Sequence, residues 1–156
     1  MAFTSARSFS GRPFKILGVQ QIAIGSLDKP ALQKFWSEVM GLEKVDSFKS
    51  EQDNVDEDIY VMGKGMAKVE LNLMTPLDPN RSPKVHVPPV NHVGFWVDDL
   101  EECALNLQIR GIKTVGGIRK GASGHNITFI HPKSACGVLV ELIQAPREII
   151  DAFNKL

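Results

Sequence analysis

The stretch Val138-Leu139-Val140-Glu141-Leu142-Ile143 decides how the rest of this 156-residue chain is interpreted. It is an apolar run typical of a strand, with one carboxylate in its middle. A carboxylate is costly there unless it is paired, hydrogen-bonded or bound to a cation. The letters Val-Glu-Leu recur at 69–71, which places Glu70 and Glu141 71 positions apart. The same spacing separates the strand-like stretches 19–24 and 90–95, so the pattern indicates two copies of one module.

The first copy predicts the order strand, helix, strand, strand, strand. Alternation along its first strand puts Val19, Gln21 and Ala23 on one face and Gln20, Ile22 and Ile24 on the other. The helix is expected to begin after Ser26 or Asp28 and to end at Gly41. The other expected elements are strands at 42–48, 59–62 and 68–74, with an acidic loop at 50–58. On the last of these strands Glu70 and Asn72 share a face.

The second copy repeats this order after a proline-rich segment at 76–89. A strand at 90–97 puts His92, Gly94 and Trp96 on one face. The next helix is expected to start at Asp98 or Asp99 and to stop at Gly111. The remaining expectations are a strand start at 111–115, a glycine-rich basic loop at 116–124, and strands at 126–130 and 138–143.

These elements predict an α+β fold in which two tandem βαβββ modules pair into one curved mixed sheet that encloses a shared site. The expected organisation is an N-terminal arm (1–16), a single domain (17–146) and a C-terminal helical tail (147–156). Within the domain, the proline-rich linker joins module one (17–76) to module two (88–146).

Composition gives no support for nucleic-acid or membrane partners. Lys plus Arg and Asp plus Glu number 18 each, so no overall charge favours nucleic acid or a membrane surface. Cys103 and Cys136 are expected to be free thiols in a reducing compartment. Residues 1–15 carry three basic residues and no acid. They are interpreted as a polar arm of a cytoplasmic protein; the alternative is a transit peptide leading to the mitochondrial matrix.

Polar residues at matching places in the two modules predict a metal site. The residues at these matching places, Gln21, Glu70, His92 and Glu141, are expected to converge in the interior of the sheet. Carboxylate, imidazole and amide oxygen suit an octahedral divalent ion such as Mn²⁺, Co²⁺, Ni²⁺, Fe²⁺ or Mg²⁺. Zinc is less favoured, because the set has one histidine and no cysteine.

The two-module pattern resembles the vicinal oxygen chelate superfamily, which includes glyoxalase I, bleomycin-resistance proteins and extradiol dioxygenases. Within it, the chain is most similar to the methylmalonyl-CoA epimerase family. The similarity rests on 129–134 (Phe-Ile-His-Pro-Lys-Ser) followed by 137–142 (Gly-Val-Leu-Val-Glu-Leu), on 121–124 (Gly-Ala-Ser-Gly), and on the Glu51-Gln52 pair before Val55.

The resemblance implies metal ligands at His92 and Glu141 and at Gln21, which stands where the family has histidine. The Val-Glu-Leu repeat favours Glu70 as the fourth position, and counting back from Pro76 favours Asn72. An amide oxygen is a weaker donor than imidazole for later first-row metals, so a site without metal is the alternative.

The implied activity is epimerisation alpha to the thioester of an acyl-CoA, through a metal-stabilised enolate, in a homodimer. Glu141 is one expected proton carrier, and the other is Glu51 by motif, or Glu57 or Asp58 by distance along the chain. Three basic residues are expected to bind the acyl-CoA phosphates or carboxylate: Arg119, Lys120 and Lys133.

Two other functions are compatible with the resemblance. One is a glyoxalase I-like lactoylglutathione lyase acting on a glutathione thioester, which Glu70 favours and the His-Pro-Lys-Ser turn disfavours. The other is a non-catalytic protein that binds a small molecule between the modules, as bleomycin-resistance proteins do. A stoichiometric transition metal in the purified protein is expected for the enzymes and not for the binding protein.

Overall fold

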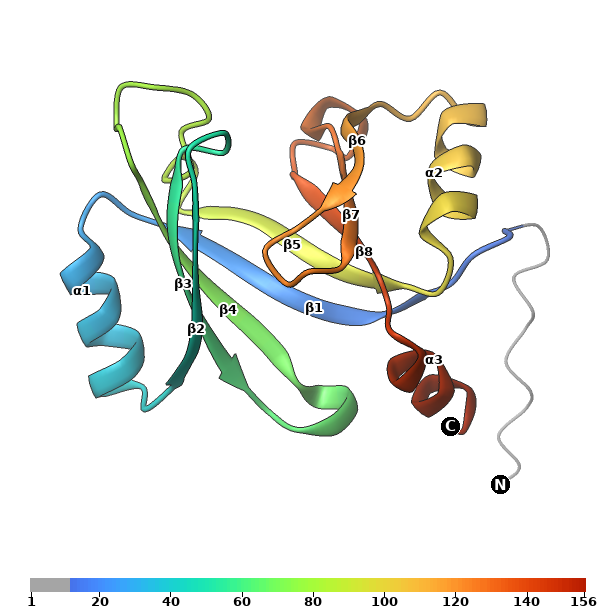
Figure 1. Ribbon diagram of the computed structural model, residues 1–156. Helices are drawn as coiled ribbons and strands as arrows, with labels where there is room; N and C mark the ends of the chain where they lie inside the picture. Colours follow the sequence, from blue (N-terminus) through green and yellow to red (C-terminus); the bar gives the residue numbers. More distant parts are fainter. Residues whose placement is uncertain (1–11) are drawn as a thin grey trace.

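A computed structural model describes residues 12–156 and shows one curved sheet with helices on its outer side (Figure 1). Most of the predicted N-terminal arm, residues 1–11, lies outside the described residues. Module one contains β1 (Ile16–Gly25), α1 (Lys29–Gln33), η1 (Lys34–Val39), β2 (Glu43–Ser50), β3 (Val55–Met62), η2 (Gly65–Ala67) and β4 (Val69–Pro76). Module two contains β5 (Val90–Val97), α2 (Leu100–Ile109), β6 (Thr114–Lys120), β7 (Asn126–Ile130), η3 (Pro132–Ser134) and β8 (Val140–Gln144), and α3 (Arg147–Asn154) follows.

The eight strands lie in the order β2-β3-β4-β1-β5-β8-β7-β6. β1 pairs in parallel with β4, and β5 pairs in parallel with β8. The antiparallel pair of β1 with β5 joins the two modules at the middle of the sheet. The sheet curls into a half-barrel whose concave face lies between the modules (Figure 1). The predicted α+β fold with two βαβββ modules is therefore confirmed.

Each module covers its outer sheet face with its own helix (Figure 1). In module one Leu32 and Trp36 pack against buried Tyr60, Leu71 and Leu73. In module two the buried residues Leu100 and Cys103 of α2 pack with Val97 and Leu142. Side chains alternate between the two faces of the sheet along each strand, and these apolar ones pack on the outer face. The side chains between them therefore face the concave interior.

The predicted helix ends agree with the structure. Asp28 caps α1 by accepting a hydrogen bond from the Ala31 amide at 3.0 Å, and Asp99 caps α2 by accepting one from the Glu102 amide at 3.0 Å. Gly41 and Gly111 follow the helices with φ near +70°, a conformation that favours glycine. One difference is that the second part of the first helix, Lys34–Val39, is π-helical.

The acidic loop expected at 50–58 is wrong, because β2 continues to Ser50 and β3 begins at Val55. Only 51–54 forms the turn. The acidic run Asp56-Glu57-Asp58, expected within that loop, lies in β3, where Glu57 and Asp58 are buried. Asp58 faces the helix side and is neutralised by lysines, and Glu57 faces the concave side. The alternation of side chains along β3, rather than their charge, decides which face of the sheet Glu57 and Asp58 occupy.

The glycine-rich segment expected as a loop at 116–124 is also partly wrong. β6 runs to Lys120, with an irregularity between Val115 and Arg119 where Gly116 and Gly117 have positive φ. The glycines therefore bend an edge strand rather than end it. At the other end of the module, β8 begins at Val140, two residues later than predicted.

The proline-rich linker packs against the open end of the concave face. The buried Asn54 side chain holds it by donating to the carbonyls of Asp78, Arg81 and Pro83 at 2.9–3.1 Å. Val85 is buried in a cluster with Ala23, Val55 and Met74. The linker therefore forms a wall of the interior besides connecting the modules.

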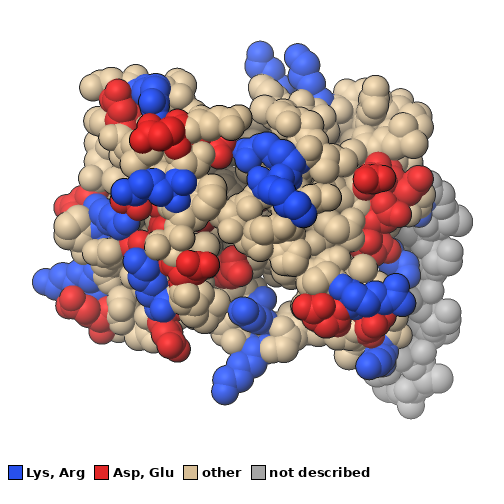
Figure 2. Space-filling view, in the orientation of Figure 1, with Lys and Arg blue, Asp and Glu red and all other residues tan. Residues whose placement is uncertain are grey.

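The surface agrees with the balanced charge of the sequence. Figure 2 shows acidic and basic residues mixed over this face, with a small basic group near its middle. Cys103 is buried and Cys136 is exposed, and both are free thiols. Within residues 12–156, no helix is long and apolar enough to cross a membrane.

Candidate active site

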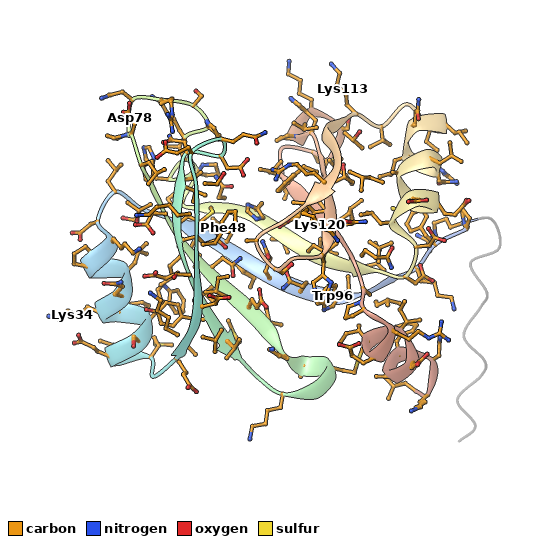
Figure 3. The ribbon with its side chains drawn as sticks, viewed as in Figure 1. Lys34, Phe48, Asp78, Trp96, Lys113 and Lys120 are labelled. Atoms are coloured by element: carbon orange, nitrogen blue, oxygen red, sulfur yellow. The ribbon has the colours of Figure 1, made fainter. Side chains whose placement is uncertain are left out.

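The concave face encloses a cavity of about 600 Å³ between the two modules. Gln21, His92 and Glu141 line its floor, and Glu57 lines the wall that β3 provides. Apolar residues cover much of the remaining wall: Phe48 (labelled in Figure 3), Val55, Met74, Val85, Ile127 and Phe129. A largely apolar cavity with a few convergent polar groups is typical of a small-molecule site.

The Gln21 carboxamide is the centre of the polar cluster. Its Nε2 donates to Glu141 Oε2 at 2.6 Å and lies 2.9 Å from His92 Nε2. Its Oε1 accepts a hydrogen bond from Asn72 Nδ2 at 3.2 Å. Gln21, Asn72, His92 and Glu141 are all buried, so these hydrogen bonds are protected from competition by water.

His92 is held by partners on both ring nitrogens. Its Nδ1 lies 2.9 Å from Asn91 Oδ1, which can only accept a hydrogen bond. The proton is therefore assigned to Nδ1, which leaves Nε2 as an acceptor for the Gln21 N–H. The Phe129 ring meets the imidazole edge to face, with centroids 5.4 Å apart.

Gly94 explains how Gln21 and Glu141 meet. In the sheet register Gln21 lies opposite Gly94 of β5, and Gly94 lies opposite Glu141 of β8. A Cβ at Gly94 would be only 2.7 Å from Gln21 Cγ. The two polar side chains therefore cross the intervening strand through space that a larger residue would fill.

The register identifies Asn72 as the fourth member of the cluster. Ala23 pairs with Asn72, and Gly94, its counterpart in the second module, pairs with Glu141. The structural counterpart of Glu141 is thus Asn72, whereas the Val-Glu-Leu repeat pointed to Glu70. Glu70 instead lines a second cavity of about 380 Å³, together with Gln20 and Trp96 (labelled in Figure 3).

Gln20 departs from the predicted alternation. It was expected on the outer face with Ile22 and Ile24, yet it lines the second cavity on the concave side. The pairing of β1 with β5 shifts between Val19 and Gln21, which is a β-bulge. Bulges redirect a side chain in this way, and the bulge lets Gln20 and Gln21 face neighbouring cavities of one concave surface.

Glu57 is the second carboxyl group of the larger cavity. Burial raises its pKa from 4.5 to about 8, with smaller contributions from the negative charges of Glu141, Glu70 and Asp53, while a hydrogen bond from Asn72 lowers it. Its Oε1 is buried without a hydrogen-bond partner among the described residues. Glu57 is therefore largely a carboxylic acid at neutral pH, and it faces the same cavity as the Glu141 carboxylate.

The other candidates for the second proton carrier lie elsewhere. Glu51, favoured by its motif, is on the turn after β2, with its side chain 81% exposed and paired to Arg81 at 3.2 Å. Asp58 faces α1 and binds Lys44 at 2.7 Å and Gln33 at 2.7 Å. Of the three acids considered, Glu57 is the one that lines the larger cavity.

The three predicted substrate-binding residues are not equivalent. Arg119 lines the larger cavity, binds Asp53 at 3.1 Å and lies over the Phe129 ring, 5.9 Å from its centroid. Because Asp53 follows β2 and Arg119 lies in β6, this ion pair joins the two modules. Lys120, labelled in Figure 3, and Lys133 are exposed, so a contact with the substrate requires that it extend out of the cavity.

The donor set does not fit the resident divalent cation that the resemblance implies. The Gln21 atom nearest to Glu141 and His92 is an N–H donor, not an acceptor. Turning the amide would break hydrogen bonds worth about 1 kcal/mol each, or about 1.5–3 to a charged group.

Two residues of the site were not predicted from the sequence. Asn91, which fixes the proton on His92, precedes it in the strand, where alternation directs a side chain to the opposite face. The role of Gly94 depends on a cross-strand register that the sequence does not contain. The sequence pattern indicated only that Gly94 lies on the same inward face of its strand as His92.

Comparison with known proteins agrees with this architecture. Residues 20–129 match the Glyoxalase/Bleomycin resistance protein/Dioxygenase superfamily. Because that match covers most of the chain, the protein belongs to this superfamily, which confirms the predicted membership.

Several of the similar proteins are methylmalonyl-CoA epimerases. The chain is 27% identical over 139 residues to the mitochondrial methylmalonyl-CoA epimerase of Mus musculus, covering 85% of this chain and 75% of the relative. It is 28% identical over 131 residues to that of Homo sapiens, covering 80% and 70%. The structure of the Mycobacterium tuberculosis epimerase is similar, with a TM-score of 0.73, 22% identity, and 87% and 93% coverage. A Streptomyces coelicolor epimerase bound to 2-nitronate-propionyl-CoA has a TM-score of 0.76, 24% identity, and 84% and 99% coverage.

Proposed function

We propose that this protein is an epimerase that inverts the carbon alpha to the thioester of a carboxylated acyl-CoA such as methylmalonyl-CoA. The observation that carries the proposal is the placement of Glu57 and Glu141 in one cavity. They stand on β3 and β8, with β4, β1 and β5 between them in the curved sheet. A substrate carbon between these walls meets one carboxyl group on each face. The similarity to methylmalonyl-CoA epimerases supports the substrate class.

The two carboxyl groups differ as acid–base chemistry requires. Glu141 takes the alpha proton from one face; the C–H bond breaks and its electron pair moves into the enolate. Protonated Glu57 then delivers its proton to the other face, and the configuration at the carbon is inverted. Afterwards Glu141 carries the proton and Glu57 is ionised, which is the state that processes the opposite enantiomer. Burial raises the pKa of Glu57 to about 8, which suits this residue to donate a proton near neutral pH.

The rest of the cavity suits a charged acyl thioester. Its apolar lining excludes water from the reacting carbon, which strengthens every polar contact there. Arg119 offers a guanidinium to a substrate carboxylate or phosphate, and such contacts are often bidentate. Arg119 is paired with Asp53, so substrate binding at this position exchanges one carboxylate partner for another.

NMR in D₂O tests the proposal by following exchange of the alpha proton of methylmalonyl-CoA. The expected result is exchange in wild-type protein that is absent from Glu141→Gln protein with the same melting temperature. Both proteins are assayed with chelator and with each of Mg²⁺, Mn²⁺ and Co²⁺, so that the assay does not presuppose a metal. Absence of exchange in every condition contradicts the epimerase function.

The arrangement of Gln21 keeps a second function open. A site whose central amide is already hydrogen-bonded is compatible with a non-catalytic protein that binds an acyl-CoA without altering it. Calorimetry distinguishes the two, because the binding protein gives saturable acyl-CoA binding without exchange. The glyoxalase-type lyase has less support, since Glu70, which favoured it, lines the second cavity.

A further inference from the structure

We propose that the Gln21 carboxamide takes the place of a divalent cation in this site, so that the protein holds no such metal and works without one. The two N–H bonds of the Gln21 amide join Glu141 to His92. The first part depends only on the geometry of the cluster. The second part rests on the proposed epimerase function.

Three atoms of the cluster are spaced like the ligands of a metal ion, but one of them is a hydrogen-bond donor. Gln21 Nε2, His92 Nε2 and Glu141 Oε2 lie 2.6, 2.9 and 3.1 Å from one another. Adjacent ligands of an octahedral ion with bonds of about 2.1 Å are about 3 Å apart, so the triangle has the size of one face of such a site. One corner, however, carries protons. Hydrogen bonds from Gln21 Nε2 hold two edges of the triangle, whereas the third edge joins two acceptors, His92 Nε2 and Glu141 Oε2, at 3.1 Å.

The orientation of the amide is fixed from both ends. Gln21 Oε1 accepts from Asn72 Nδ2, and Gln21 Nε2 has acceptors in Glu141 and His92. Rotation by half a turn would place Oε1 2.6 Å from a carboxylate oxygen and Nε2 beside the Asn72 donor. Both contacts are repulsive. The proton on Nδ1 of His92, held by Asn91, keeps Nε2 an acceptor and so supports the same orientation.

A neutral donor in this place also suits the proton transfer. The 2.6 Å hydrogen bond from its N–H group holds the Glu141 carboxylate in one orientation. Gln21 therefore serves as a positioning residue for Glu141.

Restoring a ligand tests the inference without relying on catalysis. Gln21→His places imidazole over Gly94, where the main chain leaves room. The expected result is that this variant binds one equivalent of Co²⁺ with visible d–d absorption, at least about 100-fold more tightly than wild-type protein. Gln21→His combined with Glu141→Gln should lose most of that gain. Gln21→Glu, which has the same shape as wild type, is the second variant in case the histidine protein does not fold; it should also gain Co²⁺ binding.

The wild-type protein provides the second part of the test. Its exchange of the alpha proton should be unchanged after dialysis against EDTA and after addition of Co²⁺ or Mn²⁺. Stoichiometric, tight metal binding by wild-type protein, or exchange that disappears with EDTA and returns with metal, overturns the inference. Failure of both variants to gain Co²⁺ binding also overturns it. If the variants gain the metal but wild-type protein shows no exchange in any condition, the metal inference stands and the epimerase proposal fails.

Discussion

Gln21 on β1 and Glu141 on β8 are joined by a 2.6 Å hydrogen bond that passes over the intervening strand β5. They are 120 positions apart in the chain, yet both lie in register with Gly94. Neighbouring strands are about 4.8 Å apart, so this contact spans two strand spacings and depends on the bare glycine between them. The pairing of the modules therefore builds the site, because neither module alone contains both residues.

Glu141→Gln is expected to abolish most alpha-proton exchange while leaving the fold intact. The amide has the shape of the carboxylate but cannot take up a proton at working pH, so the loss should be about 10²- to 10⁴-fold. NMR exchange rates measure it. Glu51→Gln is the matched control, because Glu51 is exposed on a turn outside the cavity lining, and its rate should stay close to wild type. A large loss in the control with none in Glu141→Gln would assign the proton transfer to the motif residue.

Glu57→Gln is expected to change how stability depends on pH. In the folded protein the pKa of Glu57 is about 8, against 4.5 for an ordinary Glu, so the native state retains a proton that the unfolded state releases. The stabilising effect of this proton is fully present below 4.5, declines as pH rises and is lost above about 8. Its size is on the order of 5 kcal/mol.

Urea unfolding of wild-type and Glu57→Gln proteins over this pH range checks the prediction. The free energy of unfolding of the wild-type protein should fall relative to the variant between the two pKa values. Parallel curves would show that Glu57 is not a buried acid. The same variant should also lose most alpha-proton exchange, because glutamine cannot deliver a proton. Exchange by wild-type protein should decline as pH rises through about 8, where Glu57 loses its proton.

The sequence was sufficient to predict the order of elements, both helix caps and three members of the polar cluster. Helix capping and apolar periodicity are local, so residues such as Asp28 and Asp99 reveal them directly. Gln21 and His92 are separated by the repeat spacing of the two modules, which places them at equivalent positions of β1 and β5. These predictions depend only on patterns within a few residues or on an unbroken repeat.

Two assignments required strand register and side-chain orientation, which the sequence does not contain. They are the fourth member of the polar cluster and the second carboxyl group of the larger cavity. The match of Glu70 with Glu141 was two residues out of register, because parallel pairing with the central strands sets equivalence, and it selects Asn72. Glu57 was a weak candidate because an acidic run resembles a solvated loop. Its neighbour Asp58 is neutralised on the helix side, which allows the run to form a buried strand.

Asp58→Asn is expected to destabilise the protein at neutral pH. Burial alone would raise the pKa of Asp58, but hydrogen bonds from Lys44, Gln33 and Lys29 and the charge of Lys29 lower it below 3.8. Its contribution is therefore present above that value and lost as pH falls through the lowered pKa. The lysines are partly exposed, so the expected cost is modest, about 1–3 kcal/mol.

Urea unfolding at neutral and at acidic pH measures this cost. The difference between wild-type and Asp58→Asn proteins should shrink in acid. Lys49→Met is the matched control, because Lys49 forms a 3.7 Å pair with Asp56 at the surface and its loss should cost little. Equal stabilities of wild-type and Asp58→Asn proteins at neutral pH would show that the lysine pairs do not stabilise β3.

Gly94→Ala is expected to damage both stability and the site. Its Cβ would lie 2.7 Å from Gln21 Cγ and 2.8 Å from Ile143 Cδ1, closer than side chains approach without moving. Overpacking of this kind costs about 1–3 kcal/mol. Displacement of the Gln21 stem also breaks its hydrogen bond to Glu141, so alpha-proton exchange should fall with stability.

A second substitution separates these two effects. Ile143→Val removes Cδ1 and with it one of the two close contacts, so the double variant Gly94→Ala, Ile143→Val should recover part of the lost unfolding free energy. It should not recover exchange, because the contact with Gln21 remains. Thermal or urea unfolding gives the first quantity and NMR the second. A Gly94→Ala protein with wild-type stability and exchange would show that the meeting of Gln21 and Glu141 does not require a glycine between them.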